Sequence, residues 1–89
     1  MATTLTADTL EDALAVGLAR VLAAANRQAR QSGVEVNESI ISITQQLANH
    51  AVVWRVNYSP KDYIGHRGGD LIVEVDPSDV TIKRVVRGQ

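Results

Sequence analysis

The first third of the chain carries the repeat of an amphipathic helix. Apolar side chains recur at intervals of three and four residues between about residues 7 and 31, which is the spacing of one helical face. Thr6 precedes this stretch as a suitable N-cap, and Gly33 follows it as a common helix terminator. The apolar face comprises Leu10, Ala13, Leu14, Gly17, Leu18, Val21, Ala24 and Ala25. The pattern predicts one long N-terminal helix, and Gly17 predicts that this helix lies close to a flat sheet.

After Val34 the repeat changes to the alternation that is typical of strands. The segments predicted as strands are residues 40–44, 52–58, 71–75 and 80–87. In the last of them the apolar side chains change sides between Ile82 and Val85, which predicts either a β-bulge near Arg84 or fraying of this strand. Consecutive antiparallel neighbours are the simplest arrangement, with the helix on one face. We therefore predict a single α+β domain over residues 1–89, with one long N-terminal helix packed on a four-stranded antiparallel sheet.

One segment of the chain fits two kinds of element. Residues 37–51 place apolar side chains at a helical spacing as well, and Asn37 would then be the N-cap of a second helix. We prefer the strand, because isoleucines clustered with Thr44 favour a pleated surface. Residues 47–50 are then the turn of a hairpin.

Composition narrows the classes of function. The 89 residues include no cysteine, and nine basic against ten acidic residues give a net charge of −1. Without disulfides a chain of this length depends on one apolar core, which fits a reducing compartment. The sequence shows no signal peptide and no apolar stretch long enough to span a membrane, so we expect a cytoplasmic protein that binds no membrane. The balanced charge gives no long-range attraction for nucleic acid.

The longest predicted connection, residues 59–69, concentrates polar side chains beside three glycines. Long loops in compact domains often carry function. The candidate partner-binding residues are Lys61, Asp62, Tyr63, His66 and Arg67. An alternative is an anion site, in which glycine N–H groups and Arg67 would bind a phosphate or carboxylate. The spacing matches neither the P-loop nor the dinucleotide fingerprint.

No residue set in the sequence indicates catalysis. His50 and His66 are the two histidines, and neither has a partner at a metal-ligand spacing. No nucleophile motif is present, so we expect no enzymatic activity and no cofactor or metal. Together with Arg55, the residues Lys83, Arg84 and Arg87 would form a basic strip on the open face of the sheet, but nucleic-acid binding would need aromatic side chains between them. We interpret them as charges that solvate an exposed sheet and discourage edge pairing.

Three short motifs carry a family resemblance. They are the strand 53–58 with Trp54, the Gly68-Gly69-Asp70 entry to the next strand, and the closing residues 85–89, with a Leu5-Thr6 step before the helix. In these motifs the chain resembles small bacterial proteins of cystatin-like or NTF2-like build, several of which are immunity proteins that neutralise a toxin by binding it. The resemblance implies an α+β fold and carries over no functional residue. The chain is shorter than NTF2-like enzymes and lacks the helices that build their pocket.

The function that these observations favour is a non-enzymatic protein-binding module, either toxin-neutralising or an adaptor. A half-covered sheet has unpaired edges, which can accept a strand from another protein or from a second copy in a homodimer. We expect binding through one sheet face or edge and through the loop 59–69. The alternative is a small-ligand or anion-binding domain that uses the same loop.

Overall fold

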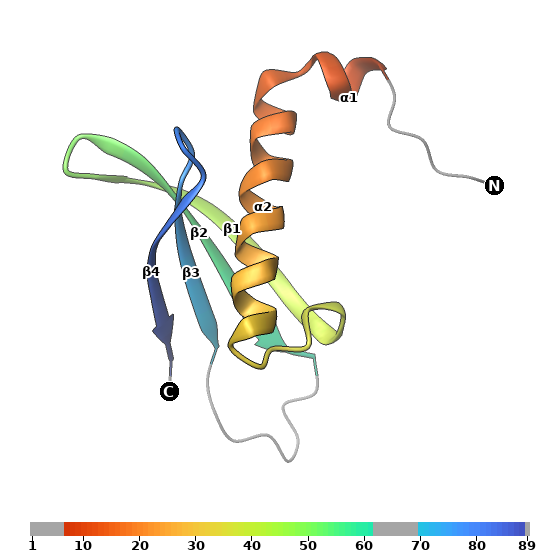
Figure 1. The fold of residues 1–89 in the computed structure, drawn as a ribbon, viewed down its shortest axis with the longest axis vertical. Coiled ribbons are helices and arrows are strands. Elements are labelled where there is room, and N and C mark those ends of the chain that lie inside the picture. The colour runs from red at the N-terminus through yellow and green to blue at the C-terminus, as the bar shows by residue number, and fades with distance from the viewer. Residues whose placement is uncertain (1–6, 62–69, 89) are drawn as a thin grey trace.

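The computed structural model describes residues 7–61 and 70–88, and it has the predicted α+β architecture (Figure 1). The helices and strands follow in the order α1 (Ala7–Glu11), α2 (Ala13–Gln31), a short 3-10 helix (Val36–Glu38), β1 (Ser39–Ala48), β2 (Ala51–Pro60), β3 (Leu71–Asp76) and β4 (Thr81–Arg87). The sheet has the strand order β1-β2-β3-β4, and every neighbouring pair is antiparallel. The long helix α2 covers one face of this sheet. Among the described residues, no helix is long and apolar enough to cross a membrane.

The predicted single helix over residues 7–31 is broken at Asp12. Asp12 has an extended backbone (φ −90°, ψ 107°), and its carboxylate accepts a hydrogen bond from the Ala15 N–H at 3.1 Å. An aspartate in this conformation is a strong N-cap, so α2 begins at Ala13 and α1 is a separate short turn of helix. The predicted N-cap, Thr6, lies outside the described residues.

The buried face of α2 differs from the predicted one. Val21, Ala25 and Ala29 are at most 1% exposed, whereas Leu10 and Leu14 are 59% and 63% exposed. The prediction was therefore right for Val21 and Ala25, and it was wrong for the two leucines. The cause is tertiary: α2 packs mainly on β3, with contacts to β2 and β4, through its C-terminal half. Figure 1 shows that its N-terminal half passes outside the sheet on the side of β1.

Gly17 does not provide the predicted close approach of the helix to the sheet. A Cβ atom built at this position would have no atom within 4 Å. Glycine costs helix stability relative to alanine, so we expect Gly17→Ala to raise the free energy of unfolding by about 0.5–1 kcal/mol. Chemical denaturation would measure this gain. Gly33→Ala is the matched control and should lower stability, because Gly33 has a φ of +88°. Destabilisation by both substitutions would mean that Gly17 has a packing role.

The strand interpretation of residues 37–51 is confirmed, and the helix alternative is wrong. β1 and β2 form a hairpin with uninterrupted pairing from Ser39↔Pro60 to Ala48↔Ala51. Asn49 and His50 connect the strands with φ values of 52° and 68°. Two successive positive φ values define a type I′ turn, whose twist matches that of the hairpin. The turn is thus shorter than the predicted 47–50, and β1 extends to Ala48.

The predicted irregularity of the last strand is confirmed. Glu74 pairs with Arg84, but the next residue, Val75, pairs with Ile82, so Lys83 is the extra residue of a β-bulge. The bulge explains why Ile82 and Val85 both lie on the helix side of the sheet. Opposite them on β3, Val73 and Val75 are fully buried.

The core is a single layer between the sheet and the C-terminal half of α2. Its buried side chains are Val21, Ala25, Ala29, Val36, Val56, Tyr58, Leu71, Val73 and Val75. Trp54 is only partly buried and packs against them. The alternating burial of β3 confirms that one face of the sheet is covered by the helix and that the other faces solvent.

Candidate protein-interaction site

The structure describes one of the five predicted binding residues of the 59–69 loop. Lys61 is exposed; its backbone N–H donates to the Glu38 carbonyl oxygen at 3.3 Å, and its ammonium group donates to the Asn37 carbonyl oxygen at 3.5 Å. Asp62, Tyr63, His66 and Arg67 lie outside the described residues, so the loop site stays a prediction. His50 is exposed in the hairpin turn. Within residues 7–61 and 70–88, no group of three or more potential metal ligands is found.

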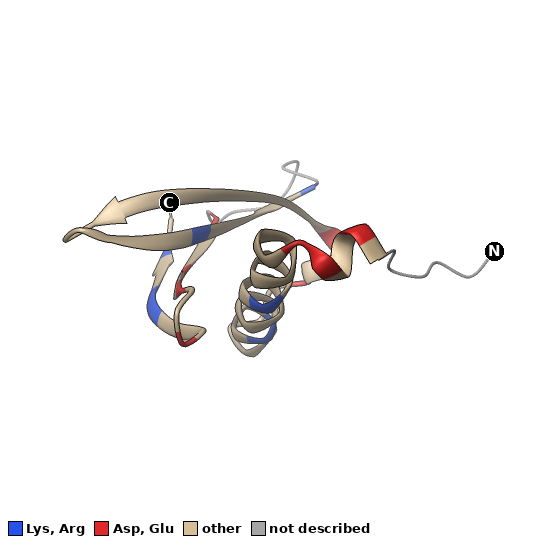
Figure 2. Ribbon diagram, turned by 90° about the horizontal axis from the view of Figure 1, so that it is seen from above, with Lys and Arg blue, Asp and Glu red and all other residues tan. Residues whose placement is uncertain are grey.

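The charged side chains on the solvent-facing side of the sheet are paired with one another. Glu74 accepts a hydrogen bond from an Arg84 guanidinium nitrogen at 3.0 Å, and the same carboxylate oxygen forms an ion pair with Arg55, whose Nε lies 3.4 Å away. Lys83 lies 3.7 Å from an Asp76 carboxylate oxygen. The arginines are thus partly neutralised by Glu74. Figure 2 shows how the basic and acidic residues are distributed over the fold. This arrangement agrees with the interpretation that Lys83 and Arg84 solvate the open face of the sheet. The interpretation is wrong for Arg87, which pairs with the buried Leu71 and donates to the Ser32 carbonyl oxygen after α2 at 2.5 Å.

The two edges of the sheet differ in how they are protected. β4 carries the basic residues Lys83, Arg84 and Arg87 and contains the bulge at Lys83. Charged side chains and bulges are the devices by which proteins keep an edge strand from pairing with another chain. β4 is therefore an edge strand that is protected against pairing with another chain.

β1 has none of these devices over its ten residues. Its sequence, SIISITQQLA, contains no charged residue and no proline, and its pairing with β2 has no bulge. Ile40 and Leu47 on this strand are 50% and 74% exposed. A long, uncharged edge strand with exposed apolar side chains is the typical template for strand addition. The sequence contained the signal, because residues 39–54 include no Asp, Glu, Lys or Arg, but the edge position of this strand is needed to interpret it.

The hairpin fixes which backbone groups of β1 point away from β2. In a two-residue hairpin the residues that flank the turn, here Ala48 and Ala51, exchange both backbone hydrogen bonds. Every second residue of β1 from Ala48 backwards therefore bonds to β2. The residues whose N–H and C=O groups point outward are Ile41, Ile43, Gln45 and Leu47. These groups form the row that an added strand would pair with.

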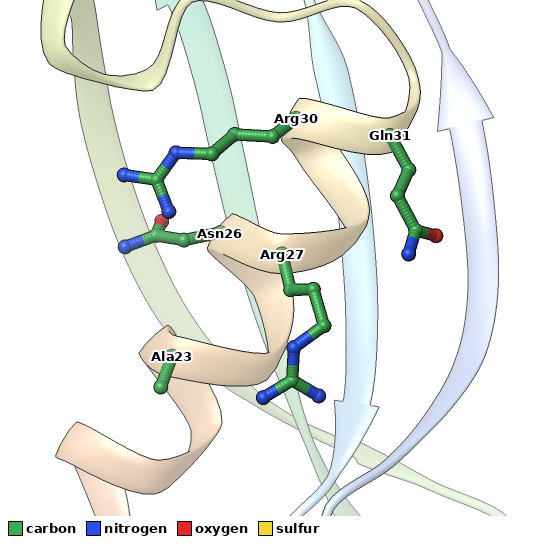
Figure 3. Close-up of a pocket in the computed structure, with 5 residues that line it drawn as sticks. All are labelled: Ala23, Asn26, Arg27, Arg30 and Gln31. Carbon is green, nitrogen blue, oxygen red and sulfur yellow. The ribbon is translucent and has the colours of Figure 1, made fainter.

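A second surface feature lies over the C-terminal half of α2. Ala23, Asn26, Arg27, Arg30 and Gln31 line an open hollow of about 590 Å³ (Figure 3). Asn26 and Arg30 extend to the same side of the helix, toward Tyr58 and Asn37. The Tyr58 hydroxyl donates to the Asn26 side-chain oxygen at 2.7 Å, and Arg30 donates to Asn37 at 3.4 Å. These hydrogen bonds connect the helix to β2 and to the 3-10 helix that precedes β1, so they have a structural role.

Tyr58 makes the stability of the fold depend on pH. Burial raises its pKa to about 12, against an ordinary value of 10.0, and the neighbouring Arg30 lowers it by a smaller amount. The folded state thus favours the protonated phenol. Its contribution to stability is complete below pH 10 and is lost as the pH rises toward 12, by up to about 1.4 kcal/mol for each pH unit.

We expect this loss to disappear in the Tyr58→Phe variant. That variant should be less stable at neutral pH by about 1 kcal/mol, because the Asn26 side chain loses its hydrogen-bond partner. Urea denaturation of both proteins between pH 8 and 12 would check this. Parallel pH profiles for wild type and variant would contradict the assignment to Tyr58.

Comparisons with protein-family models, curated proteins and solved structures found no match for this chain. The resemblance to cystatin-like immunity proteins therefore stays a prediction.

Proposed function

We propose that the protein is a non-enzymatic, cytoplasmic protein-binding module that accepts a strand of its partner at the β1 edge. The observation that carries the proposal is the contrast between the two edges of one sheet. β4 has three basic residues and a bulge, whereas β1 has no charge, proline or bulge. A monomer that did not use β1 would be exposed to aggregation at this edge.

The exposed apolar side chains also support the proposal that the β1 edge binds a partner. On the β1–β2 hairpin, Ile40, Leu47 and Val52 are 50%, 74% and 44% exposed, and on the two helices Leu10 and Leu14 are 59% and 63% exposed. Val85 on β4 is less exposed, at 39%. Exposed apolar side chains along an edge strand and its hairpin partner are typical of interaction sites. A toxin-neutralising protein and an adaptor would both use such a site, and a second copy of the chain is one partner that it fits.

A substitution that removes one outward-pointing N–H group tests the proposal. Gln45→Pro takes away a donor of the free edge without altering the hydrogen bonds to β2, and proline is tolerated at such edge positions. Gln45→Thr is the matched control, because it keeps the N–H group and favours the strand conformation. The tagged proteins would be used to capture partners from a lysate of the source organism.

The proposal predicts a stoichiometric partner that binds wild type and Gln45→Thr and is lost with Gln45→Pro. A partner retained by Gln45→Pro but lost with the Tyr63→Ala, Arg67→Ala double variant would place the binding surface on the loop 59–69 and would contradict the edge proposal.

A further inference from the structure

We infer that the β1 edge and the N-terminal half of α2 together form a roofed slot for an extended segment of another protein, and that this segment is apolar at alternate positions and basic at its flank. The inference rests on the proposed function, since it specifies the chemistry of the strand that β1 accepts. The slot is defined by the outward backbone groups of β1 and by Leu14 and Leu18 on the sheet-facing side of α2.

The helix side of the slot is formed by α2, as the direction of this helix shows. Leu14, Leu18, Val21 and Ala25 succeed one another at intervals of three and four residues, so they lie on the same face of the helix. Val21 and Ala25 on this face are buried against the sheet, whereas Leu14 is 63% exposed. Figure 1 shows the reason: α2 crosses the strands obliquely, and its N-terminal half extends past β1. Leu14 therefore lies on the sheet-facing side of the helix, N-terminal to the part of α2 that is buried against the strands.

A strand added to β1 would extend the sheet toward this part of the helix. Its backbone would pair with the outward groups of Ile41, Ile43, Gln45 and Leu47, and every second side chain would point to the helix side. On that side it would meet Leu14 and Leu18 above and Ile41 or Leu47 beside it. On the other side it would meet the polar side chains of Ser42, Thr44 and Gln46, with the exposed Ile40 at the start of the strand. The matching segment is apolar on the helix side and uncharged on the other.

The negative charge of α1 and of the residue before α2 indicates that the bound segment has basic residues. Asp8, Glu11 and Asp12 are acidic and exposed, and residues 7–19 include no basic residue. Figure 2 shows this acidic end beyond the sheet on the side of α1. In the described part of the chain, these carboxylates form no ion pair with a basic side chain. A partner with lysine or arginine beside its strand is complementary to them.

A dye-labelled peptide as long as β1 would test the slot by fluorescence anisotropy. In the probe, valine alternates with threonine and lysines stand at both ends. The first control peptide has serine in place of valine, and the second has serine in place of lysine. The protein is used as wild type, Gln45→Pro, Leu14→Ser and the Asp8→Asn, Glu11→Gln double variant. Leu14 is exposed, so its substitution should leave the fold intact.

We expect wild type to bind the probe and to bind the first control peptide at least about tenfold more weakly. Leu14→Ser should weaken binding of the probe by about tenfold, and the acid-to-amide variant should weaken it severalfold without affecting the lysine-free peptide. If Gln45→Pro abolishes binding and Leu14→Ser has no effect, the inference that α2 contacts the bound segment is wrong, whereas the proposed function stands. Binding that Gln45→Pro does not reduce would overturn both.

Self-association is the other informative outcome. Sedimentation velocity on the wild type would show whether a second copy occupies the edge. A dimer that Gln45→Pro dissociates, and that excludes the probe, would support the use of β1 but overturn the inference that the slot takes a segment of a different protein.

Discussion

Replacing Val73 by aspartate is expected to unfold the protein. Val73 lies on the central strand β3 with no exposed surface, between Val56 on β2 and the buried face of α2. The substitution removes about 1.5–3 kcal/mol of apolar burial and places a carboxylate where the described residues provide no charged partner, which costs several kcal/mol more. A domain of this size has a total stability of roughly 5–10 kcal/mol, so the loss is comparable to the whole.

Val85→Asp is the matched control for this experiment. Val85 is the registered partner of Val73 on β4 and is 39% exposed, so its aspartate stays in contact with water. We expect a cost of about 1 kcal/mol or less. Thermal unfolding followed by circular dichroism would compare the two variants. Similar losses would show that the core extends beyond β3 to the β4 edge, contrary to the burial described above.

Proline at two neighbouring positions of β1 is expected to give opposite results. Gln46 pairs with Val53 through inward-pointing backbone groups, so Gln46→Pro breaks the hairpin and should cost about 2–3 kcal/mol. Gln45 points its N–H outward, so Gln45→Pro should change the free energy of unfolding by less than about 1 kcal/mol. Both glutamines are exposed, which makes side-chain packing a small contribution in each case.

Urea denaturation of the two proline variants measures this difference without any knowledge of a partner. If Gln45→Pro were the more destabilising variant, the alternation of backbone groups along β1 would be shifted by one residue. The outward row would then consist of different residues, and the proposed edge would need a new register.

Much of the sheet could be predicted from the sequence because its strands carry local signals. The isoleucines of β1 and the alternation in β2 and β3 identify strands, and the change of parity between Ile82 and Val85 identifies the bulge. These signals depend on neighbouring residues along one strand. They need no knowledge of what covers the sheet.

The break in the helix was not predicted because Asp12 is compatible with two local structures. An acidic residue stabilises the first turns of a helix, and an aspartate is also a strong N-cap. The choice between them depends on where α2 meets the sheet.

The exposure of Leu14 has the same origin. Its spacing from Val21 and Ala25 is that of a core residue, but the sheet ends before the helix does. The candidate binding surface depends on this mismatch between helix and sheet, and sequence periodicity contains no information on it. The loop residues Asp62, Tyr63, His66 and Arg67 remain a prediction from composition alone.

Amide hydrogen exchange of β1, with and without the captured partner, tests the central claim most directly. In the free protein, the N–H groups of Ile41, Ile43, Gln45 and Leu47 should exchange rapidly, and those of Ser42, Thr44 and Gln46 should be protected by β2. On binding, we predict that the four outward groups become protected while the amides of β4 do not change. Protection confined to β4, to α2 or to the open face of the sheet, with the β1 edge still exchanging rapidly, would contradict the account.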